Sequence, residues 1–346
     1  MRGRFIIPDV VTIADVARAA GVSIATVSRV LSPGAVPHPV RADTAERVRL
    51  AARELNFFPS PMARGLASHR SGLIGLIVPD LADPHYPQIA AGVEDGAREA
   101  ELAVLICNTF GVAQRMAEYL MLLQARRVDA VVLSGGTSLN ATELLALSDC
   151  NVPMVLIGRP TSHVRWPHVS IDNRDGARQA TRHLMEIGRK RILHLAGPRS
   201  QTTMADRAAG YHEALQTEHG AAELIDSNGT PEAGYERLNT RLQSESVMPD
   251  AVFAATDRLA IAAMAVAADL HLHVPGELAI IGFDDIALAA QLRPSLTTMA
   301  QPAYELGSAA INMVKHLLAG EEIQPRSLPV RLAARASTLG PGGRYT

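Results

Sequence analysis

Several side chains that could bind a ligand or take part in chemistry follow strand-like apolar runs in this sequence. Asp83, His85 and Tyr86 come after the run 73–78, Arg159 follows 154–157, and Asp284 follows 278–283. In open α/β sheets, ligands bind outside the carboxyl ends of the strands. Polar groups at such a site discriminate well, because a ligand that leaves them unpaired is strongly disfavoured. We therefore predict a small-molecule site that contains Asp83, His85, Tyr86, Arg159, Arg207, Asp257 and Asp284.

Other segments are weaker candidates for a phosphate site or a metal site. The "LSGGTS" segment at 133–138 lacks the lysine of a phosphate-binding loop, and "HLH" at 271–273 has no third metal ligand at a useful spacing. Neither a nucleophile–base pair nor a dinucleotide fingerprint is present, so we expect no enzyme activity, no cofactor and no metal. Two cysteines, Cys107 and Cys150, do not make a disulfide framework and are consistent with a reducing cytosol.

Beyond residue 70, apolar runs alternate with helical stretches. Continuous apolar strands separated by helices are typical of a parallel sheet that is covered on both faces. About 270 residues are more than a single hydrophobic core usually accommodates, so we expect two doubly wound α/β lobes. The predicted strands cover 73–78, 103–107, 129–133, 154–157, 191–196, 251–255 and 278–283.

The N-terminal segment "VTIADVARAAGVSIATVSRVLS" (11–32) has a different pattern. Apolar residues spaced for one helical face follow Thr12, a suitable N-cap, and Gly21 ends that helix before Ser23 caps a second one. Two helices joined by a short turn with glycine form a helix-turn-helix, although a helical hairpin at the edge of a larger core would show the same pattern.

Charge distinguishes these two interpretations. Residues 1–70 hold ten arginines, no lysine and five acidic residues, a net charge of +5, whereas the whole chain is at −2 and the remainder is therefore at −7. A basic head on an acidic body favours contact between the head and a polyanion.

Residues 11–70 closely resemble the N-terminal region of the LacI family of bacterial transcriptional repressors. The helix-turn-helix is followed by "RVRLAARELNFFPSPMARGLASHRSGLIGLIVPDL", which has the family's third helix, hinge segment and first sensor strand. The resemblance continues through "GFDD", "QP" and "RAST" near the C-terminus. It implies a small all-α helix-turn-helix head on a two-lobed sensor of the periplasmic-binding-protein type, and a homodimer that binds a near-palindromic DNA operator.

The resemblance also assigns residues to DNA. The second helix is expected to enter the major groove by its N-terminal residues, with Ile24, Ala25 and Arg29 at base edges and with phosphates held by hydroxyl groups. Two copies of a hinge helix are expected in the minor groove, where Leu66 would wedge between bases. The predicted DNA-binding residues are Thr12, Ser23, Ile24, Ala25, Thr26, Ser28, Arg29, Ala63 and Leu66.

In related repressors, positions that match Arg207, Asp257 and Asp284 contact the effector, usually through sugar hydroxyls. Asp257 also suits a simpler role as a helix cap. Gly158 stands where some members carry an aspartate. Without that carboxylate, the adjacent Arg159 favours a sugar acid or sugar phosphate as the predicted ligand. Arginine at this place also bonds neutral hydroxyls, so a neutral sugar stays open.

The expected domains are a DNA-binding head at 1–58, a hinge at 59–70 and a sensor at 71–346. Lobe 1 is expected at about 71–165 and 301–330, and lobe 2 at about 166–300 and 331–340. The turn at 32–43 is longer and richer in proline than is usual in the family. No signal peptide or membrane span is recognisable, so we expect a cytoplasmic, nucleoid-associated protein. The rival classes are a sugar-binding receptor and a sugar-phosphate enzyme with an accessory head.

Overall fold

The computed structural model describes residues 11–31, 40–57, 70–135, 150–159, 166–216, 222–244 and 247–339. The chain divides into two compact units, residues 1–72 and residues 73–346, which we call the head and the sensor. No helix in these described ranges is both long enough and apolar enough to cross a membrane.

The described part of the head consists of helices α1 (Ile13–Ala20), α2 (Ile24–Leu31) and α3 (Ala42–Glu54). Gly21 has a φ of 64° and ends α1, because its amide bonds back to the last turn and the chain can reverse without a steric penalty. Short helices of this kind are marginal alone, so their shared apolar core stabilises the unit. That core consists of Val16, Ala17, Ala20, Val27, Val48, Ala51 and Ala52.

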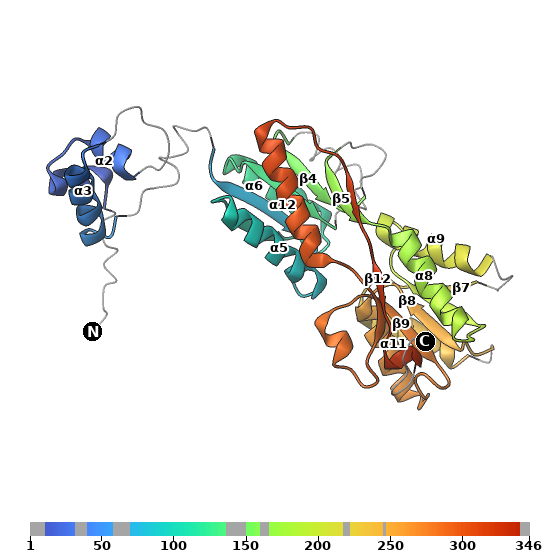
Figure 1. The fold of residues 1–346 in the computed structure, drawn as a ribbon. Coiled ribbons are helices and arrows are strands. Elements are labelled where there is room, and N and C mark those ends of the chain that lie inside the picture. Colours follow the sequence, from blue (N-terminus) through green and yellow to red (C-terminus); the bar gives the residue numbers. More distant parts are fainter. Residues whose placement is uncertain are drawn as a thin grey trace, which may run out of the picture. The chain divides into compact units, whose positions relative to one another are not determined.

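The sensor contains two six-stranded sheets with interleaved helices, seen as two lobes in Figure 1. The first sheet has the order β11-β5-β4-β3-β1-β2, and all its strands are parallel. Its strands are β1 (Leu73–Val78), β2 (Ala103–Asn108), β3 (Ala130–Ser134), β4 (Met154–Ile157), β5 (His168–Ile171) and β11 (Arg326–Leu328).

The second sheet has the order β12-β10-β9-β8-β6-β7, and only the pairing of β10 with β12 is antiparallel. Its strands are β6 (Ile192–Ala196), β7 (Glu223–Asp226), β8 (Ala251–Ala254), β9 (Ala279–Asp284), β10 (Thr297–Ala300) and β12 (Arg331–Ala333).

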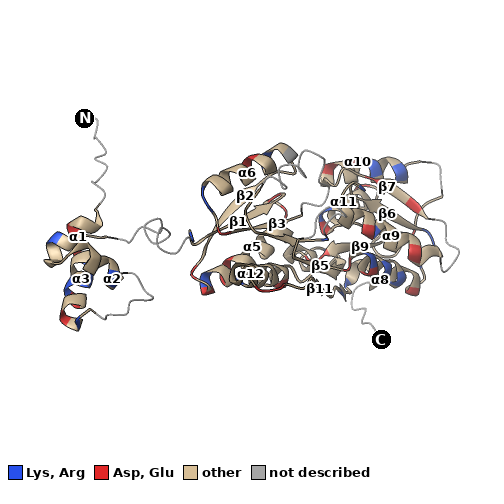
Figure 2. Ribbon diagram, turned by 90° about the horizontal axis from the view of Figure 1, so that it is seen from above, with Lys and Arg blue, Asp and Glu red and all other residues tan. Residues whose placement is uncertain are grey.

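Helices cover both faces of each sheet. In lobe 1, α5 and α12 lie side by side on one face and α6 on the other, whereas in lobe 2 the pair α8 and α9 opposes α10 and α11 (Figure 1). Figure 2 shows charged positions mainly on these helices, while the strands carry few. The bounds are α5 (His85–Glu99), α6 (Ala113–Ala125), α8 (Asn173–Glu186), α9 (Thr202–Gln216), α10 (Pro231–Leu242), α11 (Asp257–Asp269), η1 (Ala287–Ala290), α12 (Ala303–Ala319) and α13 (Ala336–Leu339).

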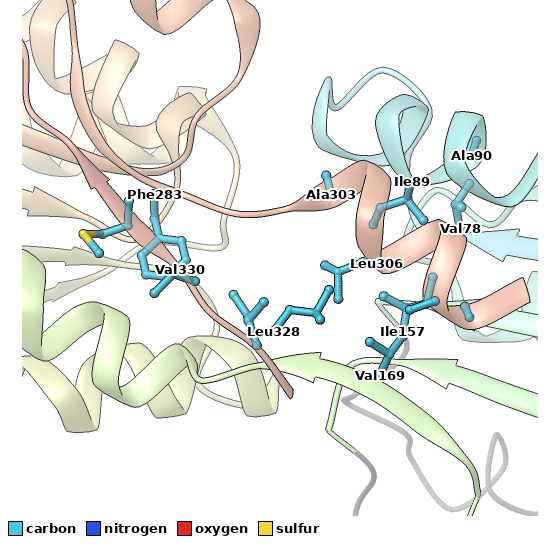
Figure 3. Close-up of a cluster of buried hydrophobic side chains, with 14 of the residues drawn as sticks. Val78, Ile89, Ala90, Ile157, Val169, Phe283, Ala303, Leu306, Leu328 and Val330 are labelled. Carbon is cyan, nitrogen blue, oxygen red and sulfur yellow. The ribbon is translucent and has the colours of Figure 1, made fainter. Parts of the chain in front are cut away.

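Along its described residues, the sensor chain crosses between the lobes three times. The crossings follow β5, β10 and β11, so α12 belongs to lobe 1 and β12 to lobe 2. The expected change of lobe at 165/166 lies too early, because β5 pairs with β4 and extends the first sheet to Ile171. Figure 3 shows buried apolar side chains along the last crossing, from Leu328 through Val330 to Phe283, so one core cluster spans both lobes.

Candidate functional site

A cavity of about 240 Å³ lies between the two lobes of the sensor. It is formed largely by residues at the carboxyl ends of strands from both sheets, as the topology rule requires. Apolar contacts come from side chains such as Ile89, Leu259 and Leu306. The polar lining residues are Asp80, Asp83, His85, Tyr86, Ser134, Ser170, Asn173, Gln201, Thr203, Arg207, Asn228, Thr230, Thr256, Arg258, Asp284 and Gln301.

Arg207 and Asp284 form the buried centre of this cavity. An Arg207 nitrogen lies 3.6 Å from an Asp284 carboxylate oxygen, and the two side chains are only 5% and 6% exposed. The guanidinium lies 3.7 Å above the centre of the Phe283 ring, and it donates hydrogen bonds to Asn173 Oδ1 and the Ala255 carbonyl oxygen. These partners fix the guanidinium plane, so the site is preorganised to present donors at a set angle.

Burial raises the pKa of Asp284 well above its usual range, and the nearby Arg207 guanidinium opposes this shift only in part. Asp284 also has a φ of 134°, a conformation that residues with a side chain rarely adopt. Gln301, from the segment after β10, donates a hydrogen bond of 2.5 Å to the Asp284 carboxylate. Strain and desolvation at one buried carboxylate are typical of a binding site.

Asp257 has a different role from the one expected, because it does not line the cavity. Its two carboxylate oxygens accept hydrogen bonds from the Ile286 amide at 2.9 Å and the Thr298 hydroxyl at 2.5 Å. A Cβ atom at Gly282 would lie 2.2 Å from the Asp257 carboxylate, so only glycine fits beneath it. Asp257 therefore holds the turn that follows Asp284, and the cap of α11 is the Thr256 hydroxyl.

Asp83, His85 and Tyr86 all line the cavity at the start of α5. Asp83 Oδ1 accepts from the His85 amide at 3.0 Å, which fixes the entry to the helix. Burial lowers the pKa of His85 to about 4, so its ring is neutral near pH 7. Its Nδ1 atom is buried and has no hydrogen-bond partner within the described parts of the chain.

Arg159 lies outside the cavity lining. Its guanidinium donates to Asp206 at 2.9 Å, and its side chain is mostly exposed. The ion pair therefore joins the segment after β4 in lobe 1 to α9 in lobe 2. Arg159 thus supplies no unpaired positive charge to a ligand, which removes the reason for favouring a sugar acid or sugar phosphate.

Sequence reasoning missed several cavity residues. Asp80 lies two residues after β1, and Arg258 lies in the first turn of the helix after β8, so the rule that selected Asp83 and Asp257 would also have selected them. Asn173 and Gln301 follow β5 and β10, which are too short and too weakly apolar to be recognised as strands. Their positions depended on pairings that a local pattern does not reveal.

In the head, α2 presents an exposed face that includes Ile24, Ala25, Ser28 and Arg29. Ile24 is 52% exposed, while Val27 on the opposite face of the helix is fully buried. The helix therefore has one face for its core and one face for a partner. A protruding helix of this size matches the width of a DNA major groove.

The Thr12 and Ser23 hydroxyl groups, at the N-termini of α1 and α2, make local hydrogen bonds. The Thr12 amide and hydroxyl both donate to Asp15, at 3.0 and 2.6 Å, and Ser23 Oγ accepts from the Thr26 amide at 3.2 Å. The Ser23 and Thr26 hydroxyls are 2.9 Å apart. Thr12 and Ser23 remain exposed, so the N-termini of α1 and α2 are accessible to anions. Ala63 and Leu66, and most of the turn at 32–43, lie outside the described residues.

Comparison with known proteins gives the class. The sequence profile of bacterial regulatory proteins of the lacI family matches residues 12–60, and that of the periplasmic binding protein-like domain matches residues 181–338. The ribose operon repressor of Halalkalibacterium halodurans is 34% identical over 95% of this chain and 97% of its own length. Catabolite control protein A of Priestia megaterium is 33% identical over 95% of this chain and 99% of its own.

Solved structures agree. A crystal structure of the Lac repressor dimer bound to operator and an anti-inducer has a TM-score of 0.84 at 28% identity, covering 95% of this chain and 99% of that one. A LacI-family regulator from Enterococcus faecium with bound ribose has a TM-score of 0.69 at 26% identity, covering 77% of this chain and 98% of that one.

The chain belongs to the LacI family. It is a DNA-binding transcriptional regulator whose two-lobed sensor responds to a small-molecule effector, and it is not an enzyme. The predicted family and fold class are confirmed.

Proposed function

We propose that this protein is a homodimeric repressor of carbohydrate genes whose effector is a neutral monosaccharide bound in the cavity between the lobes. It would work in the cytoplasm at the nucleoid, where its operators lie. The observation that carries the ligand class is the pairing of charges in the cavity. Arg207 pairs with Asp284, and Arg258 pairs with Asp80 and Asp83, so the described lining has one more carboxylate than guanidinium.

A cavity with this pairing disfavours an anionic ligand, because a carboxylate or phosphate would have to compete with Asp80, Asp83 and Asp284 for the two guanidinium groups of the described lining. Hydroxyl groups suit it better, since each can donate to a carboxylate and accept from a guanidinium or amide. The unpartnered His85 Nδ1 would gain a hydrogen bond from such a ligand. The volume of about 240 Å³ is below the range of drug-sized pockets, which favours a single sugar ring.

The ligand class is tested by titration calorimetry of the full chain with neutral pentoses and hexoses, their phosphates and uronic acids. We expect a neutral sugar to bind, and Asp284→Asn to abolish binding because its carboxylate lies in the cavity. Asp269→Asn is the matched control, since Asp269 lies at the exposed far end of α11. Binding of phosphates or uronic acids alone would overturn the proposed ligand class.

The dimer face is proposed from an exposed apolar patch on lobe 1. Edge strand β2 and the segments around α6 expose Leu105, Ile106, Phe110, Val112, Met121 and Leu122. An apolar edge strand left open to water would invite uncontrolled pairing, so a defined partner is expected to cover it. The Lac repressor, which has this fold, was solved as a dimer.

Sedimentation at graded concentrations tests this face. Met121→Asp places a charge where 64% of the side chain is exposed and should yield monomers. Val247→Asp, at an apolar position on lobe 2 that is 72% exposed, is the control and should leave the dimer intact. A Met121→Asp protein that remained dimeric would place the interface elsewhere.

The DNA-binding activity is tested by selecting duplexes from a random library at near-physiological salt, where phosphate contacts alone do not hold a complex. We expect a two-fold symmetric site, because two heads of a dimer read two half-sites. The genes beside that site would identify the pathway and its sugar. An enriched site without two-fold symmetry would contradict the proposed operator.

A further inference from the structure

Among the residues that the structure describes, three ion pairs join the two lobes of the sensor directly. Arg258 in the first turn of α11 reaches Asp80 and Asp83 in the loop between β1 and α5, at 3.5 Å each. Arg159 after β4 reaches Asp206 in α9 at 2.9 Å. Because each pair has one partner in each lobe, separation of the lobes would break it.

Local hydrogen bonds orient the two carboxylates that pair with Arg258 to form the Arg258 bridge. Asp80 uses Oδ1 to accept from the Ala82 amide at 2.9 Å, and Asp83 uses Oδ1 to accept from the His85 amide at 3.0 Å. The other oxygen of each carboxylate, Oδ2, faces the same Arg258 nitrogen. The loop therefore holds two carboxylate oxygens in position for one guanidinium.

The bridge is also part of the cavity. Asp80, Asp83 and Arg258 all line it, whereas Arg159 and Asp206 do not. Asp83 fixes the start of α5, from which His85 and Tyr86 enter the cavity. Movement of Arg258 would therefore change both the spacing of the lobes and the surface that meets the effector.

We infer that Arg258 is a positioning residue that couples effector binding to lobe closure through Asp80 and Asp83. This inference rests on the proposed effector site between the lobes. Ligands shift such an equilibrium only by their different affinity for the two states. A bridge that favours the closed state raises the affinity of any effector that binds the closed state. Because the bridge and the effector then stabilise the same state, both must shift the affinity for DNA in the same direction.

The consequence is a prediction of sign that does not depend on whether the effector induces or corepresses. Arg258→Gln should weaken effector binding by about twofold to fivefold, as expected for partly exposed ion pairs. It should also shift the DNA affinity of the effector-free protein opposite to the shift that the effector causes. A residue that only touches the ligand would leave effector-free DNA affinity unchanged.

The direct test measures lobe spacing without effector or DNA. Fluorophores on non-natural amino acids at exposed Glu94 in lobe 1 and Glu236 in lobe 2 report energy transfer, in full-length protein diluted with unlabelled chains. We expect Arg258→Gln and Asp83→Asn to increase the open population, and the double variant to add little, because both remove one contact. Arg199→Gln, which breaks an Arg–Asp pair inside lobe 2, is the control.

Salt gives a second readout. Raising ionic strength should open the wild type and have a smaller effect on Arg258→Gln, because the bridge is screened. The inference is overturned if Arg258→Gln and wild type show the same lobe distribution at low salt. Failure of the sugar ligand would leave this measurement intact, so the two proposals fail separately.

Discussion

The head and the sensor place their functional side chains in opposite environments. In the head, Ile24 and Arg29 protrude from a short helix into solvent, and the core behind them is small. In the sensor, Arg207 and Asp284 are almost fully buried and depend on partners from several strands and helices. The head can therefore change its partner contacts at little cost to its fold, whereas the sensor's binding groups are also part of its stability.

This difference predicts that binding mutations separate from folding mutations in the head and coincide with them in the sensor. The following substitutions test that contrast, from the largest expected effect to the smallest.

Arg207→Ala should be the most damaging change. It leaves Asp284 and Asn173 without their buried cationic partner, and breaking a buried pair from one side costs about 3–5 kcal/mol. Chemical denaturation of the full chain measures the free energy of unfolding. Arg199→Ala, at an exposed ion pair, should cost about 1 kcal/mol or less. Equal losses in the two variants would contradict the contrast.

Arg29→Ala should abolish the preference for operator over random duplex without changing stability. Loss of a base contact by arginine costs about 1–3 kcal/mol of discrimination. Arg53→Ala removes the same charge from an exposed position on α3 and is expected to weaken binding to all duplexes alike. Fluorescence anisotropy with both duplexes measures the ratio. Undiminished discrimination by Arg29→Ala would refute its assignment to a base edge.

Alanine substitutions at two glycines compare the stability cost of a steric clash with the cost of a left-handed backbone. A Cβ at Gly92 would lie 2.0 Å from the Tyr304 carbonyl oxygen, where α5 meets α12, so Gly92→Ala should cost about 1–3 kcal/mol or more. A Cβ at Gly21 meets no atom within 4 Å, so Gly21→Ala should cost only about 1 kcal/mol from its left-handed backbone. Thermal unfolding of both variants tests this order, and a larger loss at Gly21 would reverse it.

The pH dependence of two carboxylates should have opposite sign. Hydrogen bonds from Thr12 lower the pKa of Asp15, so its contribution to α1 is complete above about pH 3.9 and is lost as pH falls through the lowered value. Burial raises the pKa of Asp284, so its contribution is complete below about pH 3.9 and is lost as pH rises toward the raised value.

Asp15→Asn should therefore remove acid sensitivity from the exchange of α1 amides, corrected for intrinsic rates. Asp284→Asn should flatten the unfolding free energy of the sensor between about pH 4 and neutrality. Slopes of the same sign at the two residues would show that burial does not separate the two regions in this way.

Local patterns predicted much of the fold. All seven apolar runs became strands. All of them except the edge strand β2 are buried, and buried parallel strands need side chains that are apolar on both faces. Strands β5, β7, β10, β11 and β12 were missed, since they are only three or four residues long and several carry polar side chains. Short segments of this kind become strands through their neighbours in the sheet, which a window of sequence does not contain.

The sequence by itself determined the family, the helix-turn-helix and the list of polar residues near strand ends, because each of these is written in local spacing and residue type. Tertiary structure alone decided which of those residues face the cavity. Asp257 turned beneath the site to hold the Asp284 turn, Arg159 paired with Asp206, and Arg258 crossed to Asp80 and Asp83. A charged side chain takes its role from the groups that pair with it, and in a two-lobed fold those groups often come from a distant part of the chain.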